Sequence, residues 1–211
     1  MNKNKTLLST LATAAALVLS FSMSPAAHAA TLVDTGTPNG SGGFPLAFDG
    51  TDWVAAKVSF AQSTTIAGIS GYILGGANGD TFDISLYADG AKPGWQVATT
   101  TATYGSAGWN GASDLGWTVA AGTYWIEFEV NWNDTIGSSP FDEGAVFTTG
   151  VAHGVPTFTT PDDGFSYFDN GATSIGLQVT TASTVPWPAS ASTMLAGLAL
   201  LAALGIARRN A

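Results

Sequence analysis

Short runs of alternating apolar and polar residues fill the chain between its two ends. The clearest runs are 81–88, 123–132 and 174–180. Successive side chains of a strand point to opposite faces, so alternation over about four to eight residues is typical of a strand with one buried face. In the first run Phe82, Ile84 and Leu86 share one face. The same pattern predicts strands for the other two runs.

Six further runs predict strands from a weaker pattern: 53–60, 65–74, 96–104, 116–120, 145–149 and 164–168. Most of the 26 glycines fall in the interruptions between runs. Glycine accepts the positive φ that tight turns need, so the segments 88–91 and 120–123 are predicted to be turns. About eight to ten strands at this spacing predict an all-β domain, an antiparallel β-sandwich of the jelly-roll-like kind.

The amino-terminal end has a continuous apolar run instead of alternation. Lys3 and Lys5 precede apolar residues 7–21, and the small residues Ala27 and Ala29 flank His28 as a signal peptidase requires. Residues 1–29 are therefore predicted to be a signal peptide, helical in its apolar part and cut after Ala29. The body that follows, residues 30–184, has the length of one domain.

A second continuous apolar run ends the chain. Nineteen uncharged residues, 189–207, separate a proline-containing segment from two arginines. About 20 helical residues cross a hydrocarbon core about 30 Å thick, and positive charge favours the cytoplasmic side. Residues 185–211 therefore predict a transmembrane helix flanked by a motif of six residues: Val185, Pro186, Trp187, Pro188, Arg208 and Arg209.

With these residues, the tail resembles the PEP-CTERM sorting signal of Gram-negative bacteria, which a membrane peptidase called exosortase recognises. The family's usual glutamate between the prolines is Trp187 here, and the resemblance covers 27 of 211 residues. It implies an exosortase-type peptidase as a partner and a transient anchor on the periplasmic side of the inner membrane. Cleavage would then send the body to the cell surface or the extracellular space. A tail anchor that is never cleaved is the alternative.

Three segments of the body, residues 33–40, 84–90 and 121–128, carry a second and looser resemblance. Their sequences, VDTGTPNG, ISLYADG and AGTYWIEF, are similar to those of the extracellular β-sandwich found ahead of many PEP-CTERM tails. The activity of that family is largely unassigned. The resemblance therefore supports the fold more than the function.

Charge distinguishes the body from the two ends. All 15 acidic residues lie within 30–184, where Lys57 and Lys92 are the only lysines and no arginine occurs, so two positive charges against 15 negative ones leave −13. A domain this acidic repels phosphate backbones and anionic headgroups, which argues against nucleic acid as a partner. The chain has no cysteine, so its stability in an oxidising compartment does not depend on disulfides.

The segment 124–132, YWIEFEVNW, is the strongest candidate for binding chemistry. Alternation predicts a buried face and a solvated one; the buried face would hold Tyr124, Ile126, Phe128, Val130 and Trp132, and the solvated face Trp125, Glu127, Glu129 and Asn131. On that solvated face Trp125 would stack on a sugar ring while its polar neighbours hydrogen-bond to hydroxyls. A plain solvated strand is the alternative to this tentative sugar-binding face.

The carboxylates of Glu127 and Glu129 are also spaced as the two catalytic carboxylates of a glycoside hydrolase could be. Spacing of two is common on exposed strands, and no third residue is identifiable that would separate the two pKa values. No catalytic residue is therefore predicted. His153 is the single histidine of the body, and the chain has no cysteine, which argues against a zinc site. A serine-histidine-aspartate triad would depend entirely on His153.

Acidic residues also gather in predicted loops, where calcium finds oxygen ligands. The groups are Asn78-Gly79-Asp80 with Asp83, Asp142-Glu143, and Asp162-Asp163 with Asp169-Asn170. None of them matches an EF-hand loop, and turn formation is the commoner role of such residues. No cofactor or metal site is predicted, and a structural calcium ion stays an open alternative.

Three hypotheses for function follow. The preferred one is a non-enzymatic surface or matrix protein associated with exopolysaccharide or biofilm, released from the membrane by cleavage of its tail. The second is a carbohydrate-binding module that uses Trp125 and its neighbours, with extracellular polysaccharide as the partner. The third and least favoured is a glycoside hydrolase.

Overall fold

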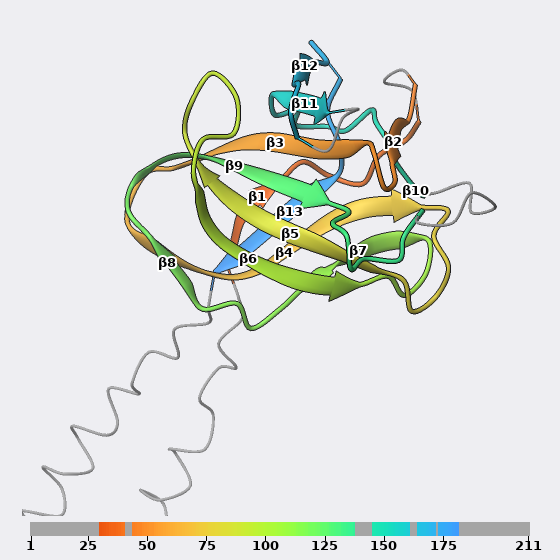
Figure 1. The fold of residues 1–211 in the computed structure, drawn as a ribbon. Coiled ribbons are helices and arrows are strands. Elements are labelled where there is room, and N and C mark those ends of the chain that lie inside the picture. Colours follow the sequence, from red (N-terminus) through yellow and green to blue (C-terminus); the bar gives the residue numbers. More distant parts are fainter. Residues whose placement is uncertain (1–29, 41–43, 138–144, 161–163, 172, 182–211) are drawn as a thin grey trace, which may run out of the picture. The chain divides into compact units, whose positions relative to one another are not determined.

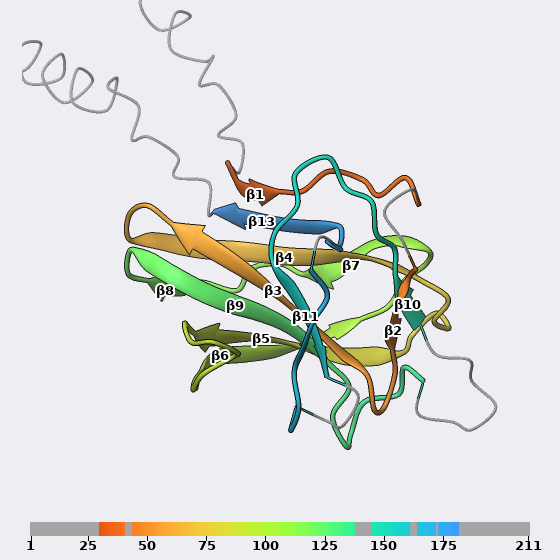
Figure 2. The ribbon, with the colours of Figure 1, turned by 90° about the horizontal axis from the view of Figure 1, so that it is seen from above.

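Two antiparallel sheets pack face to face in the computed structural model, which describes residues 30–40, 44–137, 145–160, 164–171 and 173–181. Figures 1 and 2 show the two layers, and all described residues belong to one compact unit, Ala29–Ala182. The predicted all-β sandwich is thus confirmed. Within these ranges no helix is long and apolar enough to cross a bilayer. The predicted signal peptide and sorting tail lie outside the described residues.

The first sheet is organised around its longest strand, β4 (Thr64–Leu74). Its path runs β1-β13-β4-β10-β2, and β7 and β8 also pair with β4. The bounds of these strands are β1 Thr31–Asp34, β2 Leu46–Phe48, β7 Gly108–Ala112, β8 Trp117–Val119, β10 Ala145–Phe147 and β13 Leu177–Thr181.

The second sheet has the order β12-β11-β3-β9-β5-β6, with every neighbouring pair antiparallel. Its central strand β9 (Gly122–Glu129) pairs with β3 on one side and β5 on the other. The other bounds are β3 Trp53–Phe60, β5 Thr81–Ala88, β6 Gln96–Thr103, β11 Thr157–Thr160 and β12 Phe168–Asp169.

Aromatic rings from both sheets fill the space between the layers. Phe128 of β9 packs against Phe147 of β10 with ring centroids 4.8 Å apart, and Phe48 of β2 meets Phe82 of β5 edge-on at 5.6 Å. Phe128 and Phe147 come close beside Gly71 of β4, where a Cβ would lie 2.5 Å from a ring carbon of Phe147. The faces that alternation assigned to the interior in β5 and β9 supply Phe82, Ile84, Leu86, Ile126 and Phe128 to this core.

Most of the predicted strands are present, with shifts at their ends. The run 81–88 is β5 itself, and 53–60 is β3 itself. The predicted strand 164–168 is wrong, since only Phe168 of that run belongs to a strand, the two-residue β12. Four strands of three to five residues, β1, β2, β7 and β11, were not predicted. Each is too short to show a clear alternation of its own.

Strand β9 ends three residues earlier than the run 123–132 predicted, for a local reason. The backbone N–H of Asn131 donates to the carboxylate of Asp134 at 2.8 Å, and the N–H of Asp134 donates back to the carbonyl of Asn131 at 2.9 Å. This side-chain-to-backbone turn competes with the sheet ladder. Trp132 therefore leaves the core face predicted for it and is 99% exposed.

Candidate functional site

The outer face of the second sheet carries the residues predicted to bind a sugar. Trp125, Glu127 and Glu129 alternate along β9 with the core residues Ile126 and Phe128, as predicted. Their exposure, however, was predicted wrongly. Trp125 is 1% exposed, Glu127 0% and Glu129 3%, because segments distant in the sequence fold over this part of the sheet.

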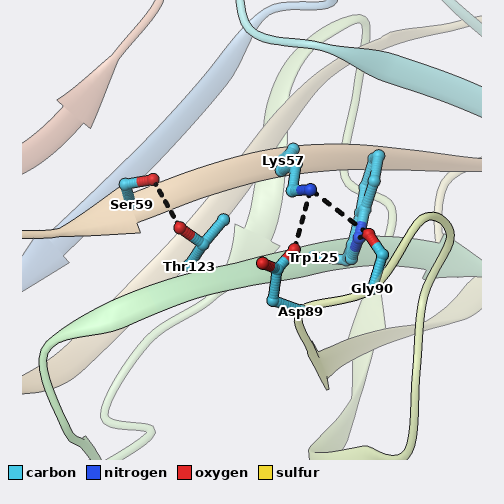
Figure 3. Close-up of polar contacts among 6 residues, drawn as sticks. All are labelled: Lys57, Ser59, Asp89, Gly90, Thr123 and Trp125. Atoms are coloured by element: carbon cyan, nitrogen blue, oxygen red, sulfur yellow. Dashed lines mark hydrogen bonds and ion pairs between the residues drawn. The ribbon is translucent and has the colours of Figure 1, made fainter.

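Trp125 lies beneath a cover drawn from three elements. Figure 3 shows Lys57 of β3 beside its ring, with the Lys57 Nζ 5.1 Å from the ring centroid. The indole Nε1–H donates to the carbonyl of Gly90 in the loop after β5, at 3.3 Å. Phe158 of β11 packs on the ring with centroids 4.8 Å apart. The ring face that a sugar would need is therefore occupied by protein.

Lys57 also fixes the loop that supplies this cover. Its ammonium forms an ion pair with Asp89 at 2.7 Å and donates to the carbonyl of Gly90 at 3.2 Å (Figure 3). The hydrogen bond from Lys57 lowers the pKa of the Asp89 carboxyl below its usual range. Both contacts hold residues 89–95, here called the β5–β6 loop, against the outer face of β3 and β9.

Lys92, the other lysine of the body, joins the same loop to the chain between β11 and β12. Its ammonium lies 5.3 Å from the ring centroid of Tyr167 and 3.5 Å from the carbonyl oxygen of Phe165. Residues 164–167, here called the β11–β12 segment, are thereby connected to the β5–β6 loop. In the view of Figure 1, that loop and the edge strands β11 and β12 all lie above β3.

The two glutamates lie next to this cover and each accepts a phenolic hydrogen bond. Tyr167 Oη donates to Glu127 Oε2 at 3.1 Å, and Tyr87 Oη donates to Glu129 Oε1 at 2.8 Å. Asn131 Nδ2 donates to Glu129 Oε2 and to Asp83 Oδ2, both at 3.0 Å. The second oxygen of Glu127, Oε1, is buried and has no hydrogen-bond partner among the described residues.

This asymmetry separates the two carboxyl groups electrostatically. Burial, followed by the charge of Glu129, raises the pKa of Glu127 to about 8, and the hydrogen bond from Tyr167 offsets only part of the rise. Burial also raises the pKa of Glu129, but hydrogen bonds from Asn131, Tyr87 and Ser85 oppose it. Glu129 is thus the better stabilised anion, and Glu127 is the group that holds a proton near neutral pH.

The two glutamates therefore form a buried hydrogen-bonded network with Tyr87, Asn131 and Tyr167. A substrate would reach either carboxyl only after displacement of the two phenols that cover them. No group of three or more acidic or histidine side chains within the described ranges is placed to hold a metal ion. Asp80, from one of the acidic groups considered for calcium, accepts the N–H of Ala77 at 2.7 Å and stabilises a turn.

Large exposed aromatic side chains mark a surface that alternation did not identify. Trp95 in the β5–β6 loop is 71% exposed and Phe165 in the β11–β12 segment is 80% exposed. Trp132, Phe44 and Phe168 are also exposed. The signal available in the sequence was a tryptophan beside glycine, Gly94-Trp95, between the predicted strands 81–88 and 96–104. A turn places its side chains outside the alternating faces of a sheet.

The remaining predicted site residues lie outside the described part of the chain. These are the cleavage-site pair Ala27 and Ala29 and the sorting motif of Val185, Pro186, Trp187, Pro188, Arg208 and Arg209. Comparison with protein-family models, curated proteins and solved structures finds no match to this chain.

Proposed function

We propose that the chain is an exported, non-enzymatic protein of the extracellular polysaccharide layer, held briefly in the inner membrane by its carboxyl-terminal tail. The observation that carries the proposal is the arrangement of the tail, with Pro186 and Pro188 before an apolar span and Arg208-Arg209 after it. In the sequence, the predicted signal peptide precedes and this tail follows a body whose buried core is drawn from residues 48–179.

The charges set the topology during export. The signal peptide delivers the body, with its charge of −13, to the periplasm, and the apolar span stops transfer while the two arginines stay in the cytoplasm. An exosortase-type peptidase then cuts near Pro186-Trp187-Pro188. The two prolines favour an extended backbone at this junction and oppose helix formation across it, which suits a protease substrate.

The finer description of the sandwich belongs to the same proposal. We infer a jelly-roll-like arrangement, because strands far apart in sequence are neighbours in both sheets. In the first sheet β13 lies between β1 and β4, and in the second β3 lies between β11 and β9. Such a body contains no cysteine and so folds without disulfides.

The test is the intact mass and the location of the product in a Gram-negative host that has an exosortase-type peptidase. The wild-type product is expected to lack residues 1–29 and most of 185–211 and to be found outside the inner membrane. Replacement of Arg208 and Arg209 by alanine should leave the tail attached and the protein in the inner membrane. Asn210→Ala, a neutral change beside them, is the matched control.

Two outcomes would overturn the proposal. Wild-type protein that keeps its full tail in the inner membrane throughout growth would refute release. Folded protein in the cytoplasm would refute export itself.

A further inference from the structure

The loops that cover the outer face of the second sheet carry two prominent exposed aromatic side chains. Trp95 stands on the β5–β6 loop and Phe165 on the β11–β12 segment, with 71% and 80% of their surfaces exposed. Water contact over rings of this size is unfavourable, and exposed aromatic groups on a soluble domain often mark a binding surface. Trp95 and Phe165 are therefore candidates for a binding surface, because they stand on two loops that contact each other.

Both aromatic residues are held on a fixed support. The base of the β5–β6 loop is closed by hydrogen bonds from Ala88 N to Trp95 O at 3.0 Å and from Gly94 N to Ala88 O at 3.1 Å. Lys92 in this loop contacts the carbonyl of Phe165 and the ring of Tyr167. The two loops are therefore tied to one another as well as to the sheet below. A surface fixed in advance loses little conformational entropy on binding.

We propose that Trp95 and Phe165, on loops joined by Lys92, form the surface by which the protein binds uncharged extracellular polysaccharide. The inference rests on the proposed function, which brings the body into the polysaccharide layer. It moves the sugar-binding site from Trp125, whose ring is covered, to the loops that cover it. Aromatic rings stack on the apolar face of a sugar, while the Lys92 ammonium is a hydrogen-bond donor for hydroxyl groups.

Charge argues against anionic occupants of this surface. The body carries −13, so anionic polymers and anionic membranes are repelled. A second copy of the chain carries the same charge and is repelled as well. An uncharged polymer is not repelled, and two exposed rings on loops joined by a lysine offer both stacking and hydrogen bonding to a chain of sugars.

The binding test uses the full-length chain in mild detergent and native gels that contain hydroxyethylcellulose, galactomannan or alginate. The neutral polymers are expected to slow the wild-type protein, and the anionic alginate is not. Trp95→Ala and Phe165→Ala should each weaken binding by roughly tenfold or more, since each removes a large ring from the contact. Trp132→Ala and Phe44→Ala remove rings that are even more exposed, 99% and 89%, on other loops, and should bind as the wild type does.

Three results would overturn the inference: no retardation by either neutral polymer, stronger retardation by alginate, or equal losses in the Trp95 and Trp132 variants. In the host, Trp95→Ala should be exported and processed normally but pass from the polysaccharide layer into the medium. Failure of export or processing in the wild type would instead refute the proposed function. The gel assay on purified protein would still decide the binding surface in that case.

Discussion

Glu127 gives the sharpest test of the structure, through the substitution Glu127→Gln. The carboxyl is fully buried, and its pKa is raised to about 8 from an ordinary 4.5. Below pH 4.5 both folded and unfolded chains hold the proton, so the group costs nothing. Between 4.5 and 8 the unfolded chain has lost the proton while the folded one keeps it, so the free energy of unfolding falls as pH rises.

The size of the effect follows from the shift. One pKa unit corresponds to about 1.4 kcal/mol, so the full shift costs about 5 kcal/mol above pH 8 and about 3–4 kcal/mol of that accrues between pH 5 and pH 8. Local opening of the β11–β12 segment, which would hydrate Glu127, sets a ceiling on the cost. Glutamine has the same shape and cannot ionise. The substitution should therefore be nearly neutral at pH 5 and stabilising by several kcal/mol at pH 8.

Urea unfolding of residues 30–184, followed by tryptophan fluorescence at pH 5, 6.5 and 8, measures this difference. Asp114→Asn is the control, because it makes the same carboxyl-to-amide change in an exposed loop. Asparagine tolerates the positive φ of 58° at that position. A stability difference for Glu127→Gln that stays constant from pH 5 to pH 8, or that the control reproduces, would refute the buried protonated carboxyl.

Two further predictions concern packing and the cover. Gly71→Ala should lower the free energy of unfolding in urea by about 1–3 kcal/mol, since the added Cβ would meet a core phenylalanine ring at 2.5 Å. Gly105→Ala is the control. Its Cβ would have only a contact at 3.9 Å, so it should cost less than about 1 kcal/mol. Lys57→Met should lower stability by about 1 kcal/mol and speed hydrogen exchange of the Trp125 indole, because the ring loses its cation and the loop loses two contacts. Asp89→Asn removes only the ion pair, and equal exchange rates in the two variants would contradict this account of the cover.

The strands were predictable where one buried face imposes alternation over a long run. β3 and β5 have the predicted bounds because each has apolar side chains facing the core at alternating positions and neighbours on both edges of the strand. Residues 164–168 misled the prediction. Apolar and polar residues alternate there as well. The chain nevertheless forms a turn before β12, and the side chain of Tyr167 donates a hydrogen bond to Glu127.

The burial of the predicted sugar-binding face could not be foreseen from the sequence of β9. Alternation correctly assigned Trp125 and Glu127 to the face opposite the core. Whether that face meets water depends on Gly90, Phe158 and Tyr167, which lie between 33 and 40 residues along the chain from the residues of β9 that they contact. Periodicity within a strand contains no information about such distant contacts, because it reports only which side chains share a face.

The two lysines of the body explain why binding is better assigned to the loops than to the strand. In a domain of 15 acidic residues, Lys57 fixes one end of the β5–β6 loop and Lys92 joins that loop to the β11–β12 segment. Both lysines thus hold in place the loops that cover the two buried glutamates. A cover held in this way hides Trp125 and at the same time presents Trp95 at its surface. A partner of the proposed kind would therefore encounter the aromatic side chains of the cover, while the buried residues of β9 would act on stability and on its dependence on pH.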